Sequence, residues 1–127
     1  MEEPKRKYKA QSIRYVENAF SFIEAGDAEK AGELLWGAMA EALKAVAASE
    51  GKKIEHHWEI GNYARELTKR LGDNSIFDAY GHASYLHSGF YEAGLCMEDV
   101  YTYAMEMRET LEKLFPSYSL EEEKWIK

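Results

Sequence analysis

The stretch GDAEKAGELLWGAMAEALKAVAASEG, residues 26–51, predicts the central helix of a helical domain. Asp27 belongs to the residue types that cap a helix N-terminus, and Gly51 to those that end a helix. Small and apolar residues recur at helical spacing on two sides, as the stripes Ala31, Leu35, Ala38, Ala42 and Gly32, Trp36, Met39, Leu43. A helix that is apolar on two sides is enclosed by neighbours, and its small residues let those neighbours approach closely. We therefore expect Trp36 to be buried and structural.

Apolar residues also recur at helical spacing before and after residues 26–51. Strand-favouring residues are scarce, because Val, Ile and Thr account for only 12 of the 127 residues, so an all-α domain is predicted. The expected helices are one from about Tyr8 to Ala25, the central one, a third marked by Ile60 to Leu71, a fourth starting near Asn74 and a fifth opened by Glu98 and Asp99. Their inward-facing residues include Ile13, Val16, Phe20, Ile23, Ile60, Leu67, Leu71, Ile76, Leu86, Phe90, Val100, Leu111 and Leu114. After Pro116, Ser119 and Glu122 predict a capping box for a short last turn.

Length and charge narrow the functional classes. We expect one domain over residues 1–127, with a basic N-terminal tail at 1–8 and an acidic extension at 116–127. A net charge of −7 repels a phosphate backbone unless positive charge gathers locally, which argues against nonspecific DNA packaging. The basic run from Lys5 to Lys9 is interpreted as a solvated tail rather than a nucleic-acid arm. No signal peptide or membrane span is evident, so a cytoplasmic protein is expected.

Several familiar site patterns do not occur in the sequence. No Glu-x-x-His pair is found, which argues against a di-metal bundle site. The single cysteine, Cys96, excludes an intramolecular disulfide and is interpreted as a small buried residue. The neighbours His56 and His57 are predicted to act in a loop or a helix cap, because adjacent helical residues do not share a face. We expect neither a metal ion nor a cofactor.

The segment HASYLHSGFYEAGLCMEDVY, residues 82–101, carries two histidines five positions apart. Five residues advance a helix by about 140°, so His82 and His87 are expected to point in different directions. Asp78 lies one turn before His82 and Tyr91 one turn after His87, spacings at which one side chain can orient the other. Two interpretations of these residues remain. In the first, which the spacing alone favours, they form buried hydrogen bonds that hold helices together. In the second, they form a functional site.

Two longer patterns resemble known families. The stretch 26–51, followed by the histidine pair and a third helix, resembles the HEPN superfamily in its Gly-Asp turn, its Lys-Ala helix character and its histidine before the next helix. LHSGFYEAGLCMEDV, residues 86–100, is similar to the signature of the archaeal PaREP family, a HEPN-like group of small proteins. The resemblance covers roughly residues 10–115. It implies an antiparallel four-helix up-down bundle with a short additional C-terminal helix, paired as a homodimer.

The resemblance also implies where a site would lie. HEPN ribonucleases carry Arg-x4-6-His on the helix that corresponds to the fourth one here, and the two copies face each other across the dimer to cut RNA without metal. His87 occupies the histidine position of that motif, whereas the arginine position falls on His82. Arginine is charged at every physiological pH and grips phosphate with two hydrogen bonds. Its replacement weakens the case for an enzyme.

Two functions are predicted, in this order. The first is a noncatalytic homodimer that binds a nucleotide, an RNA or a partner such as the nucleotidyltransferase of a toxin–antitoxin pair. The second is a metal-independent ribonuclease in which His82 and His87 share the acid and base roles, with Ser88, Tyr91 and Asp78 as the neighbouring binding residues. A purely structural role comes third. The aromatic residues, too many for so small a bundle to enclose, also predict a homodimer.

Overall fold

The computed structural model describes residues 2–89 and 94–115 of the chain. Within these ranges the regular elements are the helices α1 (Glu2–Glu24), α2 (Ala28–Ser49), α3 (His57–Leu71), α4 (Asn74–Gly89) and α5 (Met97–Leu114). The prediction of an all-α domain is confirmed. None of these described helices is both long and apolar enough to cross a bilayer. The short turn predicted at 119–127 lies outside the described residues.

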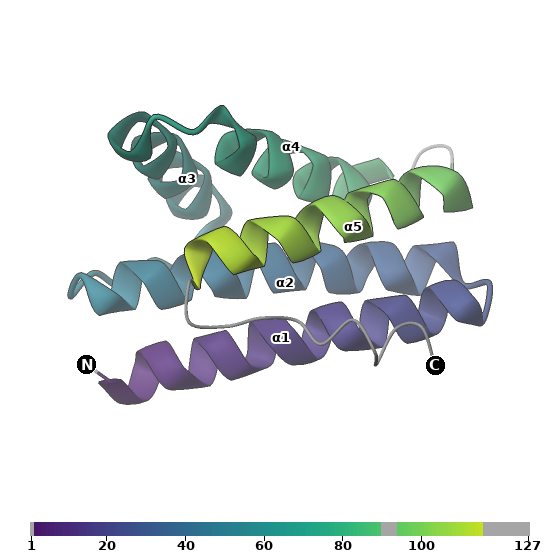
Figure 1. The fold of residues 1–127 in the computed structure, drawn as a ribbon, viewed down its shortest axis with the longest axis horizontal. Helices are drawn as coiled ribbons and strands as arrows, with labels where there is room; N and C mark the ends of the chain where they lie inside the picture. The colour runs from purple at the N-terminus through teal and green to yellow at the C-terminus, as the bar shows by residue number, and fades with distance from the viewer. Residues whose placement is uncertain (1, 90–93, 116–127) are drawn as a thin grey trace.

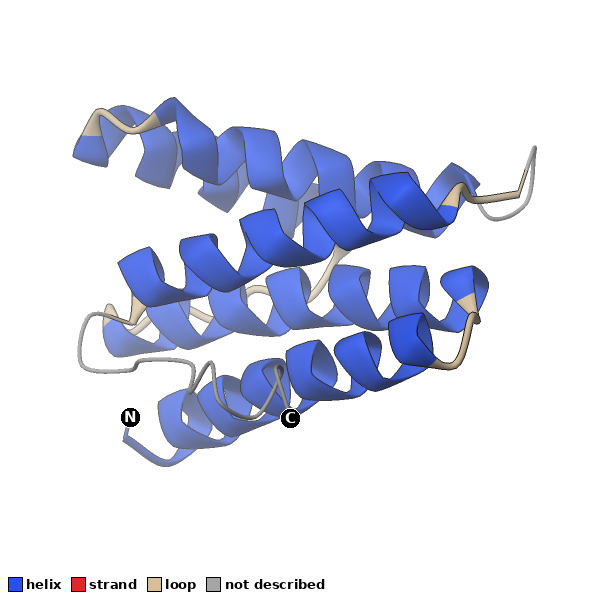
Figure 2. Ribbon diagram, turned by 45° about the vertical axis from the view of Figure 1, so that its right-hand side comes forward, coloured by secondary structure: helices blue, strands red, loops and turns tan. Residues whose placement is uncertain are grey.

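Four of the helices alternate in direction and form the bundle. α1 and α4 run one way, α2 and α5 run the other, and α3 crosses between two of them (Figure 1). Figure 2 shows the same arrangement from the side, with α1, α2 and α5 stacked in order. The expected bundle with one additional helix is therefore present. The additional described helix is α3, however, which has 15 residues and is inserted between α2 and α4.

The central position predicted for α2 is confirmed. Asp27 caps it by accepting a 3.1 Å hydrogen bond from the Lys30 backbone N–H, and α2 packs against each of the other four helices. Close approach follows from its small residues: a Cβ on Gly37 would lie 3.0 Å from the Tyr15 ring. Both predicted stripes are buried except at Trp36. α2 thus organises the core, and one side chain in it departs from the expected pattern.

The N-terminal basic run extends α1 instead of forming a tail. The helix begins at Glu2 and has Pro4 in its first turn, where the missing N–H removes no helical hydrogen bond. Tyr8 packs against the core, and the Lys44 ammonium lies 5.9 Å from the centre of its ring. Arg6 and Lys7 are exposed, as predicted for the run, whereas Lys5 and Lys9 are half-buried.

Two residues expected inside lie at the surface. Leu71 is 57 % exposed, because it is the last residue of α3 and Gly72, with φ 66°, turns the chain away at once. Cys96 is exposed and occupies the N-cap position of α5. Phe90 lies outside the described residues. Of the other inward-facing residues named above, Ile13, Ile23 and Leu114 are half-buried. The rest are buried, as helical spacing predicted.

Candidate functional site

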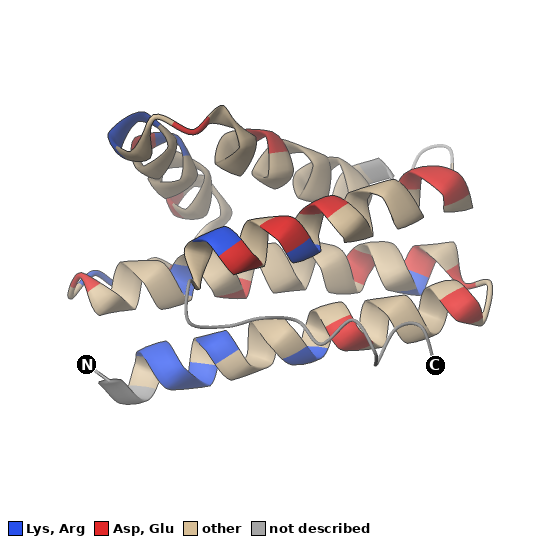
Figure 3. Cartoon of the chain, in the orientation of Figure 1, with Lys and Arg blue, Asp and Glu red and all other residues tan. Residues whose placement is uncertain are grey.

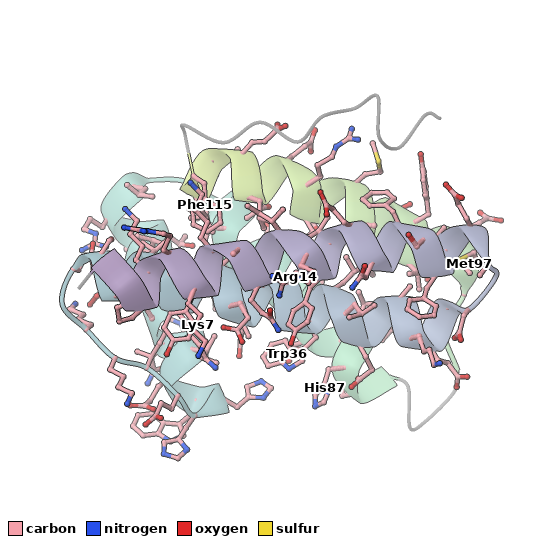
Figure 4. The ribbon with its side chains drawn as sticks, turned by 90° about the horizontal axis from the view of Figure 1, so that it is seen from below. Lys7, Arg14, Trp36, His87, Met97 and Phe115 are labelled. Atoms are coloured by element: carbon pink, nitrogen blue, oxygen red, sulfur yellow. The ribbon has the colours of Figure 1, made fainter. Side chains whose placement is uncertain are left out.

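Three rings from three helices meet on one face of the molecule. The Trp36 indole of α2 stacks with the His57 imidazole of α3, at 4.6 Å between ring centres, and with the His87 imidazole of α4, at 5.5 Å. The two imidazole centres are 6.4 Å apart, well under the sum of the other two distances, so both imidazoles lie over the same side of the indole. We call Trp36, His57, His87 and the adjoining Glu33 the indole–imidazole cluster. Figure 4 shows Trp36 and His87 side by side.

Local sequence positions the His57 ring. His57 is the first residue of α3 and His56 is its N-cap. The Glu59 carboxylate accepts a 2.8 Å hydrogen bond from the His56 backbone N–H, and such backbone hydrogen bonds lower the pKa of Glu59. The capping role predicted for this pair is confirmed at His56. His57 instead turns its ring onto α2.

Trp36 is half-buried, so the prediction that it is buried is wrong. It packs against the core, but the rings that cover its outer side are themselves accessible. His57 is exposed, and the His87 side chain retains 36 % of its accessible surface. A ligand that reaches these imidazoles therefore also comes close to the indole.

The His87 imidazole has a carboxylate partner. Glu33 Oε1 lies 2.9 Å from His87 Nδ1, so the carboxylate fixes the orientation of the ring. The described residues provide no partner for His87 Nε2. His57 Nε2 lies 3.5 Å from the Ser84 hydroxyl, at the limit of a hydrogen bond. Two neighbouring imidazoles, one of them oriented by a carboxylate, have the geometry for general acid and base chemistry.

Ring contacts continue from the cluster between α3 and α4. We call this series the α3–α4 seam; its members, in order, are His87, Trp36, His57, Tyr80, Phe77 and Arg65. The Tyr80 ring is 6.2 Å from His57 and 5.8 Å from Phe77. The Arg65 guanidinium lies 5.0 Å from the centre of the Phe77 ring. The seam therefore begins with imidazoles and ends with a fixed positive charge.

The middle of the seam depends on a close approach between the two helices. A Cβ on Gly61 would lie 2.8 Å from the Tyr80 hydroxyl, so any other residue at this position would require the Tyr80 ring to shift. Burial raises the pKa of Tyr80, and the Arg65 charge opposes that rise. Beyond Tyr80, a hollow of about 400 Å³ has Arg65, Lys69 and Asp78 among its lining residues. Asp78, predicted as a binding residue, thus belongs to the cationic end of the seam.

His82 faces the opposite side of α4, as the helical spacing predicted. Its Nδ1 lies 2.7 Å from Glu106 Oε1 of α5, and its ring stacks on Tyr103 at 4.5 Å and 12°. Burial is the first cause that raises the pKa of Tyr103. The carboxylate beside His82 is that of Glu106, in place of the expected Asp78. Within one chain His82 and His87 therefore belong to separate sites.

Two further predicted site residues do not join the cluster. The exposed Ser88 hydroxyl donates to the backbone carbonyls of Ser84 and Tyr85, at 3.2 and 3.4 Å. Tyr91 lies outside the described residues. Of the predicted site residues, only His87 is found in the cluster. In the ranges 2–89 and 94–115, no group of three or more His, Cys, Asp or Glu side chains could hold a metal ion.

Glu33, Trp36 and His57 were not among the predicted site residues. One local signal was available, because Glu33 and Trp36 are three residues apart and so share a helix face. No such signal joins either of them to His57, which sits on another helix.

Comparisons with known proteins bear on the family and the fold. The sequence profile of the archaeal PaREP1/PaREP8 family matches residues 7–111. No curated protein matches the chain. A crystal structure of a protein from Sulfolobus solfataricus is similar, with a TM-score of 0.73 and 20 % sequence identity over 84 % of this chain and 95 % of that one. At that identity the likeness concerns the fold alone.

Proposed function

The chain belongs to the archaeal PaREP1/PaREP8 family, and we propose that it binds single-stranded RNA. One observation carries the proposal: Trp36, His57 and His87 gather at an accessible end of the α3–α4 seam. Proteins hold unpaired RNA bases by stacking them on aromatic and imidazole rings, and they hold the phosphates with cations. The cluster offers rings, and Arg65 and Lys69 at the far end of the seam offer cations.

The length of the seam favours a short strand over a single nucleotide. His57 and Lys69 both lie on α3, where twelve residues span about 18 Å. The net charge of −7 does not exclude RNA binding, because Lys and Arg residues gather at the end of the molecule where α1 begins and α3 ends (Figure 3). Locally gathered positive charge is what phosphate binding requires.

Fluorescence anisotropy with a labelled single-stranded RNA tests the proposal. Trp36→Ala should weaken binding about fivefold to a hundredfold, the effect of losing one stacking platform. Trp58→Ala is the matched control, since Trp58 lies outside the cluster and is 66 % exposed. Equal affinities for the native protein and Trp36→Ala, or equal losses in the two variants, would refute RNA binding at the cluster.

Ribonuclease activity is a second candidate, which the His57 and His87 pair favours. With two imidazole centres 6.4 Å apart, one ring can take the proton of a 2′-hydroxyl while the other protonates the departing 5′-oxygen. The 2′-oxygen then bonds to phosphorus as the bond to the 5′-oxygen breaks. The products are a 2′,3′-cyclic phosphate and a free 5′-hydroxyl.

Cleavage of the same RNA in the presence of EDTA distinguishes this candidate from binding alone. His57→Ala and His87→Ala should each abolish cleavage, whereas His82→Ala, which keeps the cluster intact, should not. Binding without cleavage by the native protein would leave the first function and reject the second. Loss of cleavage in His82→Ala would place the chemistry on the other face of α4.

A homodimer is part of the proposal. Tyr85 and Tyr101, on the α4 and α5 side, are each 49 % exposed, and Tyr85 contacts Tyr103 edge to face. Tyr101 lies on another face of α5, against Phe20 of α1, so the surface around Tyr85 is the one proposed for pairing, because aromatic residues are enriched at contact surfaces. Light scattering should give twice the monomer mass, and Tyr85→Arg should reduce it; a monomer at micromolar concentration would contradict pairing. Kinship with HEPN proteins, a nucleotidyltransferase partner and a cytoplasmic location stay predictions of the sequence.

A further inference from the structure

A separate hollow lies at the C-terminal end of α2. It has a volume of about 300 Å³ and forms where the first turns of α1 meet the end of α2 and the connection to α3. Its lining residues in the described part of the chain are Pro4, Tyr8, Lys44, Ala48, Lys52, Lys53 and Ile54. None of them belongs to the indole–imidazole cluster or to the α3–α4 seam. We call it the lysine hollow.

The charged side chains that line the lysine hollow in the described part of the chain are all positive. Lys44, Lys52 and Lys53 line it, and no carboxylate is found among its described lining residues. In a chain of net charge −7, three ammonium groups around one hollow form a local region of positive potential. Figure 3 shows the basic residues of α1 at this same end of the molecule.

Two of the three ammonium groups form exposed ion pairs with carboxylates. Lys52 Nζ lies 3.2 Å from Glu66, and Lys53 Nζ lies 3.9 Å from Glu55. All four side chains are about half exposed or more. Exposed ion pairs contribute little to stability. A multiply charged anion can therefore replace these carboxylates at small cost.

The third ammonium group is set deeper. Lys44 is half-buried, and its ammonium lies 5.9 Å from the centre of the Tyr8 ring. Glu41 is the carboxylate that faces Lys44 on α2; burial raises its pKa, while Lys44 and Lys7 act in the opposite direction. Glu41 does not line the hollow. An anion inside the hollow therefore meets Lys44 from a side on which the described lining residues carry no negative charge.

The remaining lining groups are apolar or aromatic. Sites for small organic ligands combine apolar walls with a few placed polar groups, and their volumes start near about 300 Å³. Lysine binds phosphate as a mobile point charge, so three lysines suit more than one phosphate group. We propose that the lysine hollow binds a small organic diphosphate or triphosphate, with its phosphates among the three lysines and its organic part against Tyr8 and Ile54.

Titration calorimetry on the full chain with ADP, pyrophosphate and orthophosphate tests the ligand class. ADP should bind more tightly than pyrophosphate, because only ADP reaches the apolar wall. Pyrophosphate should bind at least about tenfold more tightly than orthophosphate, the effect of one additional charge-assisted hydrogen bond. No binding of ADP at about 1 mM, the affinity of a few such contacts, would overturn the proposal. Equal affinities for ADP and pyrophosphate would overturn the role of the organic part.

Charge-neutral variants test the location. Lys44→Gln combined with Lys53→Gln should weaken ADP binding about tenfold or more. Lys30→Gln, which removes the same charge near the other end of α2, should change it less than about twofold. If the double variant unfolds, Lys53→Gln alone decides, since this side chain is 72 % exposed and should still weaken ADP binding at least about threefold. Unchanged affinity in the lysine variants would overturn the assignment. RNA anisotropy with the same variants reports on the cluster separately, so either proposal can fail without the other.

Discussion

The two histidines of α4 have nearly the same immediate surroundings. His82 has Glu106 at 2.7 Å and stacks on Tyr103; His87 has Glu33 at 2.9 Å and stacks on Trp36. Each is an imidazole that a carboxylate orients and an aromatic ring supports. The difference is what lies beyond the aromatic ring.

Beyond Trp36 lies a second imidazole, that of His57, and then the cationic end of the seam. Beyond Tyr103 lies Tyr85, which is 49 % exposed. A histidine paired with a carboxylate is therefore not by itself a sign of function in this fold, because the same unit can simply join two helices. His87 differs from His82 because a third helix, α3, adds the imidazole of His57 beside it.

The largest expected effect concerns α4, because this helix carries both histidines. We call each histidine, with its carboxylate and its aromatic ring, a histidine unit. Leu86 is fully buried between the two units on α4. Leu86→Ala should lower the free energy of unfolding by about 2–5 kcal/mol, through the loss of buried methyl groups and the cavity that remains. Urea unfolding measures this loss. A change below about 0.5 kcal/mol, the usual result at a surface position, would mean that α4 is not held as described and that both units are misplaced.

The next effect separates the two units. His57→Ala should weaken RNA binding by about 1 kcal/mol or more, roughly fivefold or above, because it removes one ring from the stacking surface. His56→Ala, its neighbour at the helix cap, should leave RNA binding nearly unchanged. Anisotropy with both variants measures the contrast. If His57→Ala and His56→Ala had the same effect on RNA binding, the His57 imidazole would not set the surroundings of His87 apart from those of His82.

Removing the carboxylates should have small and equal effects on stability. Glu33→Gln and Glu106→Gln each break a partly exposed pair, which contributes at most about 1 kcal/mol. Their effects on RNA should differ, because only Glu33 orients a ring of the cluster. Thermal unfolding and RNA binding of the two variants, measured side by side, check both statements. A larger RNA effect in Glu106→Gln would reverse the comparison.

The smallest effect concerns a network without histidine. Tyr63 donates a 2.7 Å hydrogen bond to Glu50, and burial followed by this bond raises the pKa of Tyr63. A group whose pKa is raised in the folded state stabilises the protein fully at any pH below its unfolded-state pKa, which is about 10 for tyrosine. This stabilisation is lost as the pH rises above that value. Tyr63→Phe should therefore show a shallower fall in melting temperature between about pH 9 and 11. An unchanged slope would show that Tyr63 does not hold its proton in the folded state.

Much of the fold could be predicted from the sequence, because burial along a helix is a local property. Ile76, Ala79, Ala83 and Leu86 recur at spacings of three and four, and all four are buried. Burial departs from the predicted pattern where side chains of a neighbouring helix determine the surroundings of a residue. Trp36 continues the same kind of stripe, yet it meets imidazoles rather than apolar side chains.

The partners of the site residues could not be predicted from spacing. Reasoning within one helix paired His82 with Asp78, whereas its carboxylate comes from Glu106, 24 residues away. The partner of His87, Glu33, is 54 residues away. Such pairs depend on how helices cross, and a single sequence contains no direct record of those crossings.

The crossing of α3 has a dynamic consequence. α3 buries one face, through residues such as Ile60 and Leu67, whereas α2 is covered by all of its neighbours. Elements with fewer buried contacts open at lower free energy than the core, without global unfolding. An opening of α3 carries away His57 and Arg65 and leaves Trp36 with the bundle. The amides of α3 should then exchange with solvent before those of α2, and their exchange rate measures how often the cluster is taken apart and rebuilt.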